Sequence, residues 1–129
     1  MAILPPTHPL VEADRFPVER LRQEPFIEFL PGQETDNSRM LQQLQIRPKI
    51  RFATSDSRAA IAMVRAGLGI TLLNDILTAD LADGVAVLPL DPPQSVHLGI
   101  ALPEEEHVSP AAKRFITYAL DRLPELDVL

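Results

Sequence analysis

The side chains that most often carry out catalysis are few and scattered in this sequence. The histidines, His8, His97 and His107, stand apart from one another, and no HExxH spacing is present. The chain has no cysteine, which excludes thiolate chemistry, disulfides and cysteine-ligated metals. No GxSxG elbow occurs, and no serine is placed beside a histidine in the local pattern of a nucleophile and its base. We therefore expect no enzymatic activity, no metal site and no cofactor, and we interpret the histidines as surface or core-edge residues.

Small polar residues instead follow three predicted strands, at the point where each strand ends. The candidate ligand contacts are Pro31, Gly32, Thr35, Thr54, Ser55, Ser57, Leu73 and Asn74. Hydroxyl groups beside free backbone N–H groups at helix starts suit a small anion such as a carboxylate. Because the same residue types are the usual helix caps, plain capping stays open as the alternative for each hydroxyl.

A pair of glycines superficially resembles a phosphate-binding loop. Gly67-Leu68-Gly69, however, follows a predicted helix and precedes a predicted strand, which is the reverse of the order that phosphate binding requires. We interpret Gly67 as the left-handed residue that closes a helix.

The elements that must position the candidate residues alternate between strand and helix. Strands are predicted at 26–30, 49–54 and 70–73, and helices at 17–23, 35–45 and 57–66; further along come a helix around 76–82, strands at 85–90 and 96–102, and a helix from Pro110. Short connections between alternating strands and helices are typical of an α/β fold with a largely parallel sheet. We expect 26–30, 50–54 and 70–73 to be buried and parallel, so that their ends meet at one edge, where ligands bind in such folds.

The composition indicates a globular domain and argues against nucleic-acid-binding, membrane-spanning and exported proteins. The 129 residues carry a formal net charge of −6, with 46% hydrophobic and 23% charged residues, as in an ordinary globular domain. The acidic balance and the lack of a basic run argue against nucleic-acid binding by this chain. No stretch of about 18 apolar residues predicts a membrane span, and the proline-rich start is unlike a signal peptide. We expect a cytoplasmic protein without membrane contact.

Six segments, taken in order, resemble the effector-binding domain of LysR-type transcriptional regulators. They are His8-Pro9-Leu10, Arg20-Leu21-Arg22-Gln23-Glu24-Pro25-Phe26-Ile27, Leu30-Pro31-Gly32, Ala66-Gly67-Leu68-Gly69-Ile70-Thr71-Leu72-Leu73, Val87-Leu88-Pro89-Leu90 and Ser109-Pro110-Ala111-Ala112-Lys113-Arg114-Phe115. The likeness extends from about His8 to Leu123.

The resemblance implies a fold like that of type 2 periplasmic binding proteins, in which two α/β subdomains hold a small effector in the cleft between them. On this basis residues 1–17 are an extended segment approaching the first interdomain crossing, 18–95 form subdomain II, and 96–129 supply the return strand and C-terminal helix of subdomain I. The implied effector contacts fall on Thr54-Ser55 and on the loop after Leu30. The winged helix-turn-helix, the linker helix and the first half of the effector domain lie outside this sequence.

We therefore expect the effector-sensing and oligomerisation portion of a LysR-type regulator. Its predicted partners are a small-molecule effector, such as a carboxylate, and a second copy in a homodimer or higher homo-oligomer; DNA is reached only through the missing winged helix-turn-helix. One alternative is a solute-binding protein of the same architecture, which would need a signal peptide and a complete two-lobed chain. Another is a small enzyme with an acid–base pair at the strand ends, where we interpret the nearby carboxylates Asp56 and Asp75 as helix caps.

Overall fold

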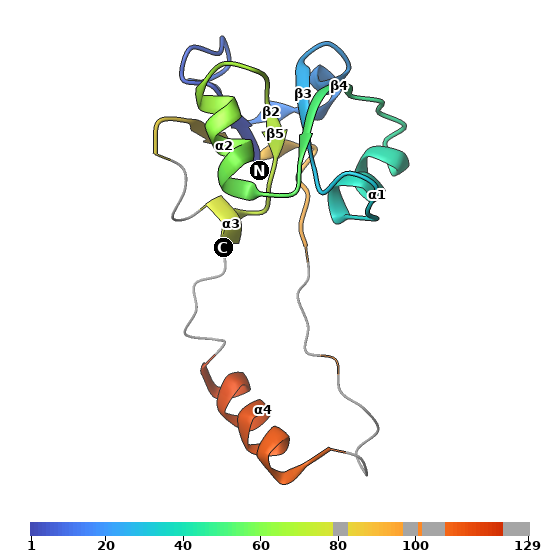
Figure 1. Ribbon diagram of the computed structural model, residues 1–129, viewed down its shortest axis with the longest axis vertical. Helices are drawn as coiled ribbons and strands as arrows, with labels where there is room; N and C mark the ends of the chain where they lie inside the picture. Colours follow the sequence, from blue (N-terminus) through green and yellow to red (C-terminus); the bar gives the residue numbers. More distant parts are fainter. Residues whose placement is uncertain (79–82, 97–100, 102–107, 123–129) are drawn as a thin grey trace. The chain divides into compact units, whose positions relative to one another are not determined.

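The computed structural model describes residues 1–78, 83–96, 101 and 108–122. The chain divides into two units, Met1–Val96 and His97–Leu129, and each is considered by itself. The first unit contains the strands β1 (Ala2–Leu4), β2 (Phe16–Pro17), β3 (Pro25–Phe29), β4 (Lys49–Thr54), β5 (Thr71–Leu72), β6 (Ala86–Leu88) and β7 (Leu90–Asp91), together with the 3₁₀ helix η1 (Val18–Arg22) and the helices α1 (Asp36–Gln43), α2 (Ser57–Arg65) and α3 (Asp75–Thr78) (Figure 1).

The predicted parallel arrangement of the three central strands is confirmed. β3 pairs with β4 in parallel, from Pro25 opposite Lys49 to Phe29 opposite Thr54. A parallel bridge joins Phe26 to Ile70, just before β5, and the Ile27 N–H donates to the Ile70 carbonyl at 2.8 Å. The three strands therefore run in one direction, and their carboxyl ends lie at one edge.

Helices pack on both faces of this sheet, because alternate residues of a strand point to opposite faces. Phe26 belongs to a buried cluster that includes Met40 and Leu41 of α1. The next residue of β3, Ile27, belongs to a second buried cluster that includes Ile61 and Val64 of α2. α1 and α2 therefore cover opposite faces, as Figure 1 shows within this unit.

The most buried strand of the sheet comes from the N-terminal segment. β1 lies between β5 and β6 and is antiparallel to both, and all three of its side chains are buried. From sequence, residues 1–17 are predicted only to be extended, since three apolar residues are too short a run to mark a strand by periodicity. β5, β1 and β6 thus form a three-stranded antiparallel sheet, and the parallel bridge between Phe26 and Ile70 joins it to the parallel pair of β3 and β4.

The prediction that strand 50–54 is buried is wrong. β4 forms over Lys49–Thr54 as predicted, but Ile50 and Phe52 are 48% and 40% exposed. A register shift between Phe26 and Ile27 of β3 breaks the alternation of β4, and within the described residues β4 pairs on one side only. An irregular edge strand of this kind cannot hide both of its faces.

The predicted single strand at 85–90 is also wrong, because it is divided at Pro89. β6 pairs with β1, whereas β7 pairs with Phe16–Pro17 of β2 in parallel. Pro89 has no N–H to donate to a ladder, and its carbonyl instead accepts a hydrogen bond from the Phe16 N–H at 2.8 Å. Of the helix predicted at 76–82, Asp75–Thr78 is present as α3, and 79–82 lie outside the described residues.

The second unit is described for one helix, α4 (Pro110–Arg122). The Ala112 N–H donates to Ser109 Oγ at 3.2 Å, which confirms the predicted N-terminal cap. None of its described side chains is buried, and Phe115, Tyr118 and Leu120 are each about three-fifths exposed. The predicted strand at 96–102 falls mostly outside the described residues. No helix in the described part of the chain is long and apolar enough to cross a membrane.

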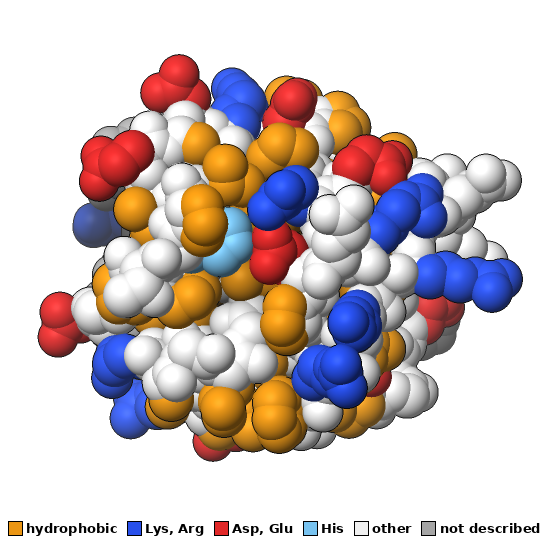
Figure 2. Space-filling view, turned by 90° about the horizontal axis from the view of Figure 1, so that it is seen from above, with side chains coloured by type: hydrophobic (Ala, Val, Ile, Leu, Met, Phe, Trp, Pro, Cys, Tyr) orange, Lys and Arg blue, Asp and Glu red, His pale blue; other side chains and the backbone are white. Residues whose placement is uncertain are grey.

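His8 is a core-edge histidine, as expected. Its ring is buried beside Phe16, Nδ1 accepts from the Leu10 N–H at 3.1 Å, and Nε2 lies 3.4 Å from Glu24 Oε1. Figure 2 shows one face of the molecule, on which apolar, acidic and basic side chains lie side by side. On that face the Lys and Arg side chains are interspersed with Asp and Glu side chains, unlike the continuous basic surface of a nucleic-acid-binding protein.

In the isolated 129-residue chain, the free amino group of Met1 should make the free energy of unfolding depend on pH. The Met1 ammonium donates to the Leu73 carbonyl at 2.8 Å, and its burial lowers its pKa below the ordinary value of 8.0, against an opposing effect of Asp75. The unfolded chain therefore binds more protons just below pH 8, so the free energy of unfolding should rise as the pH increases toward 8. Denaturant unfolding of protein with Met1 shown intact by mass spectrometry tests this; Nα-acetylation should remove the dependence, and an unchanged slope would contradict the assignment.

Candidate functional site

Hydrogen bonds connect the carboxyl end of β3 to that of β4, and the start of α1 to the carboxyl end of β5. The Leu30 N–H, just after β3, donates to the Thr54 carbonyl at the end of β4 at 2.9 Å. Asn37 Nδ2, in the first turn of α1, donates to the Leu72 carbonyl at the end of β5, also at 2.9 Å. The structure thus brings the loop at Pro31, the Thr54 turn and the start of α1 to one edge of the sheet.

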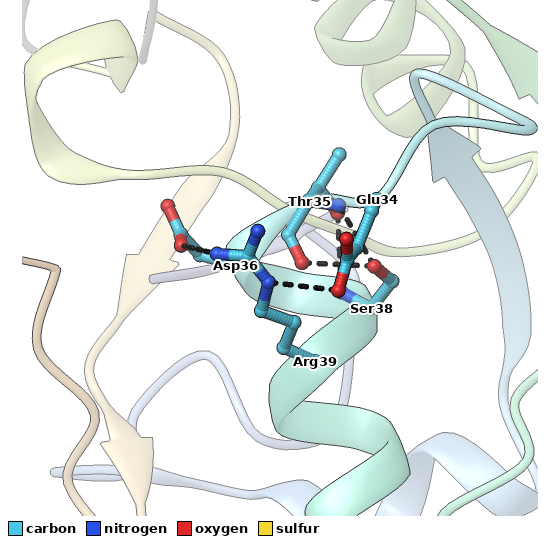
Figure 3. A network of polar contacts seen from close by, with 5 residues as sticks. All are labelled: Glu34, Thr35, Asp36, Ser38 and Arg39. Carbon is cyan, nitrogen blue, oxygen red and sulfur yellow. Dashed lines mark hydrogen bonds and ion pairs between the residues drawn. The ribbon is translucent and has the colours of Figure 1, made fainter.

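A network of polar contacts surrounds the start of α1 (Figure 3). Thr35 and Ser38 form a capping box: each side-chain hydroxyl accepts a hydrogen bond from the backbone N–H of the other residue. Arg39 Nε lies 3.1 Å from Glu34 Oε1, and Nη1 lies 3.5 Å from Asp36 Oδ1. The hydrogen bond to Glu34 raises the pKa of Arg39, so its charge is fixed and is shared by two carboxylates.

The start of α2 is capped by a carboxylate. Asp56 Oδ1 accepts hydrogen bonds from the Arg58 and Ala59 N–H groups at 2.8 and 3.0 Å. Thr54 Oγ1 accepts from the Asp56 N–H at 3.1 Å and thereby orders the turn that leads into the helix. At the other end of the helix, Gly67 has the predicted left-handed conformation, with φ of +75°. The interpretation of Asp56 as a helix cap is confirmed.

In the loop after β5, the side chain of Asn74 caps a helix and the side chain of Leu73 is buried. Asn74 Oδ1 accepts from the Leu77 N–H at 2.9 Å at the start of α3. The Leu73 side chain is 2% exposed and belongs to the buried cluster under α2. Of Leu73, only the backbone can therefore contact a ligand. Its N–H already donates to the Met1 carbonyl at 3.1 Å and its carbonyl already accepts from the Met1 amino group, so a second hydrogen bond to that carbonyl is what remains open.

The predicted residues thus divide into two kinds. The side chains of Thr35, Thr54 and Asn74 accept hydrogen bonds from backbone N–H groups at helix caps or turns, which is the capping role left open as the alternative to ligand contact. Ser55 is exposed and Ser57 half-buried, and no side-chain hydrogen bond joins either to another described residue. Pro31 and Gly32 are exposed in the loop after β3, where Gly32 has φ of +74°.

Sequence reasoning missed one residue that shapes this edge. Asn37 links α1 to β5, yet nothing in its spacing distinguishes it from the other polar residues of an exposed helical turn. Contacts of this kind depend on how a helix is placed against a strand, which periodicity does not describe.

Two substitutions of Asp56 should show whether its charge or its capping hydrogen bonds stabilise α2. Asp56→Ala removes two hydrogen bonds to helix N–H groups and should lower the free energy of unfolding by about 1–2 kcal/mol. Asp56→Asn keeps a capping oxygen and should cost about 0.5 kcal/mol or less. Urea unfolding of the two variants measures the difference. Equal losses would show that the carboxylate charge, and not the cap, matters.

Parallel strands with helices on both faces, and with polar loops gathered at the carboxyl ends of those strands, are the arrangement of an α/β fold whose ligands bind at that edge. The family model described as "LysR substrate binding domain" matches residues 1–124. The chain belongs to this family, and both the predicted resemblance and the predicted fold are confirmed.

Individual relatives agree with this assignment. The chain is 31% identical over 122 residues to the HTH-type transcriptional regulator YwbI of Bacillus subtilis (strain 168), covering 92% of this chain and 40% of that protein. Among solved structures it is similar to HinK, a LysR family transcriptional regulator from Pseudomonas aeruginosa, with 25% identity and a TM-score of 0.76 over 95% of this chain and 44% of that chain.

A further structural neighbour contains a bound small molecule. The effector-binding domain of QuiR, solved in complex with shikimate, gives a TM-score of 0.69 at 20% identity, over 97% of this chain and 61% of that chain. This likeness shows the fold alone. The chain spans about two-fifths of the length of the curated relatives it matches.

Proposed function

We propose that this chain is the effector-sensing and oligomerisation portion of a LysR-type transcriptional regulator, and that it performs no catalysis. The observation that carries the proposal is the family match over residues 1–124. The alignment of the three strand ends supports it, since ligands of such folds lie outside the carboxyl ends of the strands. Because regulators of this family act on DNA, we place the protein in the cytoplasm.

The proposed effector site lies along the strand-end edge. It is formed by Pro31 and Gly32 of the first loop, by the Thr54, Ser55 and Ser57 hydroxyls of the second, and by Thr35, Asn74 and the backbone of Leu73 beside them. The opposite wall of the cleft belongs to residues outside this sequence. The ligand is a small organic molecule, and the shikimate bound by QuiR suggests an organic acid.

The coding sequence upstream of Met1 tests the proposed function directly. We expect it to encode a winged helix-turn-helix, a linker helix and the first half of the effector domain. A protein that includes these residues should bind promoter DNA, and a small organic acid should change that binding. An unrelated upstream sequence would contradict the proposal that the chain belongs to a DNA-binding regulator.

The 129-residue chain alone should bind effectors weakly, because half of the cleft wall is missing. We expect dissociation constants in the millimolar range or above in calorimetric titrations with small organic acids. We also expect no sequence-specific gel shift with DNA at moderate salt, since the chain has a net charge of −6. Micromolar effector binding by this chain would contradict the proposed incomplete site.

We also propose that the chain contributes to a homodimer or higher homo-oligomer. β4 exposes Ile50 and Phe52, and α4 exposes Phe115, Tyr118 and Leu120. Exposed apolar side chains that lie together often mark protein–protein interfaces. Sedimentation of the longer protein should give at least a dimer, and a monomer at micromolar concentration would contradict this part of the proposal.

A further inference from the structure

The turn that leads into β6 contains a residue pair that can rearrange its own backbone. Asp83-Gly84 is the one place in the sequence where an aspartate or asparagine precedes a glycine. Both residues are exposed. Glycine has no side chain beside its nitrogen, so a neighbouring carboxyl group can reach that nitrogen with little steric hindrance. The pair is therefore a candidate site of covalent modification.

The Asp83 carboxylate is also less restrained than the carboxylates at the helix starts. Asp56 Oδ1 accepts hydrogen bonds from two backbone N–H groups of α2, and Asp75 Oδ1 accepts from the Ile76 N–H at 3.0 Å. No hydrogen bond or ion pair joins the Asp83 carboxylate to another residue in the part of the chain that the structure describes. The Asp83 side chain can therefore rotate toward the nitrogen of the next residue.

The peptide group between Asp83 and Gly84 accepts a hydrogen bond from a charged donor. Arg65, the last residue of α2, donates from Nη2 to the Asp83 carbonyl oxygen. Its Nε lies 3.0 Å from the position that a Cβ would take at Gly84. The carbonyl oxygen and the Gly84 nitrogen share one delocalised peptide group. A positive donor at the oxygen stabilises negative charge on that group, which makes the Gly84 N–H easier to deprotonate and its nitrogen a better nucleophile.

We propose that Asp83 converts spontaneously to isoaspartate in the folded chain, and that Arg65 promotes the conversion. The Gly84 nitrogen attacks Cγ of the Asp83 carboxyl group, and a nitrogen–carbon bond closes a five-membered succinimide. The carboxyl hydroxyl leaves with the amide proton as water. Water then opens the ring: attack at Cγ restores aspartate, and attack at the main-chain carbonyl carbon leaves the chain linked through Cγ, which is isoaspartate. Water is the sole co-reactant.

The rearrangement would lengthen the backbone just before a strand of the core. Isoaspartate places the Cβ of Asp83 in the main chain, while its mass is unchanged and it keeps a free carboxylate. β6 begins at Ala86 and pairs with β1, whose three side chains are buried. We expect the longer turn to move the carbonyl away from Arg65 and to loosen the start of β6. The modified chain would be a substrate for a carboxyl methyltransferase that recognises isoaspartate.

Ageing of the purified 129-residue chain at neutral pH over several weeks tests the site. Peptide mapping separates isoaspartyl from aspartyl peptides of equal mass. Isoaspartate should accumulate at Asp83 at least about tenfold faster than at Asp56, whose side chain is held by hydrogen bonds. The matched variant Asp83→Glu keeps the charge but would have to close a larger ring, so it should form no rearranged product at this position.

Two variants of Arg65 test its role. Arg65→Met removes the charged donor and should slow the conversion about threefold in the folded chain, whereas Arg65→Lys keeps a charge and a donor and should slow it less. Arg65 is exposed, so circular dichroism should show both variants folded. In guanidinium chloride the hydrogen bond between Arg65 and Asp83 is absent, and all three chains should convert at the same rate.

The denatured chain also provides the reference for the negative results. If the denatured chain forms isoaspartate at Asp83 and the folded chain forms none, the proposed site is overturned. If Arg65→Met converts as fast as the unchanged chain under native conditions, or faster, Arg65 does not promote the conversion and that part of the proposal is wrong.

Discussion

Replacing Gly69 with alanine should lower the free energy of unfolding by about 3 kcal/mol or more. Gly69 has φ of +157°, and an added Cβ would lie 2.5 Å from the Pro25 carbonyl oxygen. That carbonyl accepts the Ile70 N–H, one of the bonds that join β3 to the start of β5. The substitution therefore combines a strained backbone with a clash at the centre of the sheet. Circular dichroism and urea unfolding measure the loss.

A second glycine in the same loop provides the control. Gly67 also has a positive φ, +75°, but a Cβ there would meet nothing within 4 Å. Gly67→Ala should therefore cost only about 1 kcal/mol, the penalty of the left-handed conformation alone. If both variants lose the same stability, the close approach of Gly69 to β3 is not what requires glycine.

Truncation of Phe16 should produce the second large loss. Its side chain is fully buried in the cluster on the α1 face and packs beside His8, while its backbone joins β2 to β7. Phe16→Ala should lower the free energy of unfolding by about 3–5 kcal/mol, from lost burial and the cavity left behind. The free energy of unfolding of a typical domain is about 5–15 kcal/mol, so this loss is a large fraction of the total.

Phe115 serves as the matched control for the same chemical change. It lies on α4 with 65% of its surface exposed, so Phe115→Ala should change the unfolding free energy by about 0.5 kcal/mol or less. Chemical denaturation followed by circular dichroism compares the two. A small loss for Phe16→Ala would show that the α1 face is packed differently from the structure described above.

The parts of the fold that the sequence predicted well are those specified by local patterns. α2 begins at Ser57 after an aspartate cap and ends before Gly67, because capping residues and a left-handed glycine mark the ends of a helix within a few positions. The extent of β4 was predicted correctly, since its alternation is visible over six residues.

What the sequence did not reveal depends on partners distant in the chain. β1 is central only because β5 and β6, about 70 residues and more away, flank it. The exposure of β4 follows from its position at the edge of the sheet and from its irregular register with β3. Neither property is encoded in the segment itself, because the alternation of polar and apolar residues in β4 predicts a buried face whether the strand is central or at an edge.

The candidate site shows the same division. Sequence reasoning located the strand ends, because a strand followed by a capped helix fixes where a parallel sheet exposes its loops. It could not decide between capping and ligand contact for each hydroxyl, since the same side chains serve both roles. The structure assigns Thr35 and Thr54 to capping or turn bonds and leaves Ser55 and Ser57 without such bonds in the described residues.

The direction of β3 relative to β4 is the feature on which the proposed site depends most. Nuclear Overhauser contacts between their backbone protons measure it directly in the labelled 129-residue chain. We expect contacts between Phe29 and Thr54 at one end and between Pro25 and Lys49 at the other, as in the parallel register. Contacts between Phe29 and Lys49 would mean antiparallel strands; they would separate the two loops that form the site and contradict the assignment of an effector-binding wall.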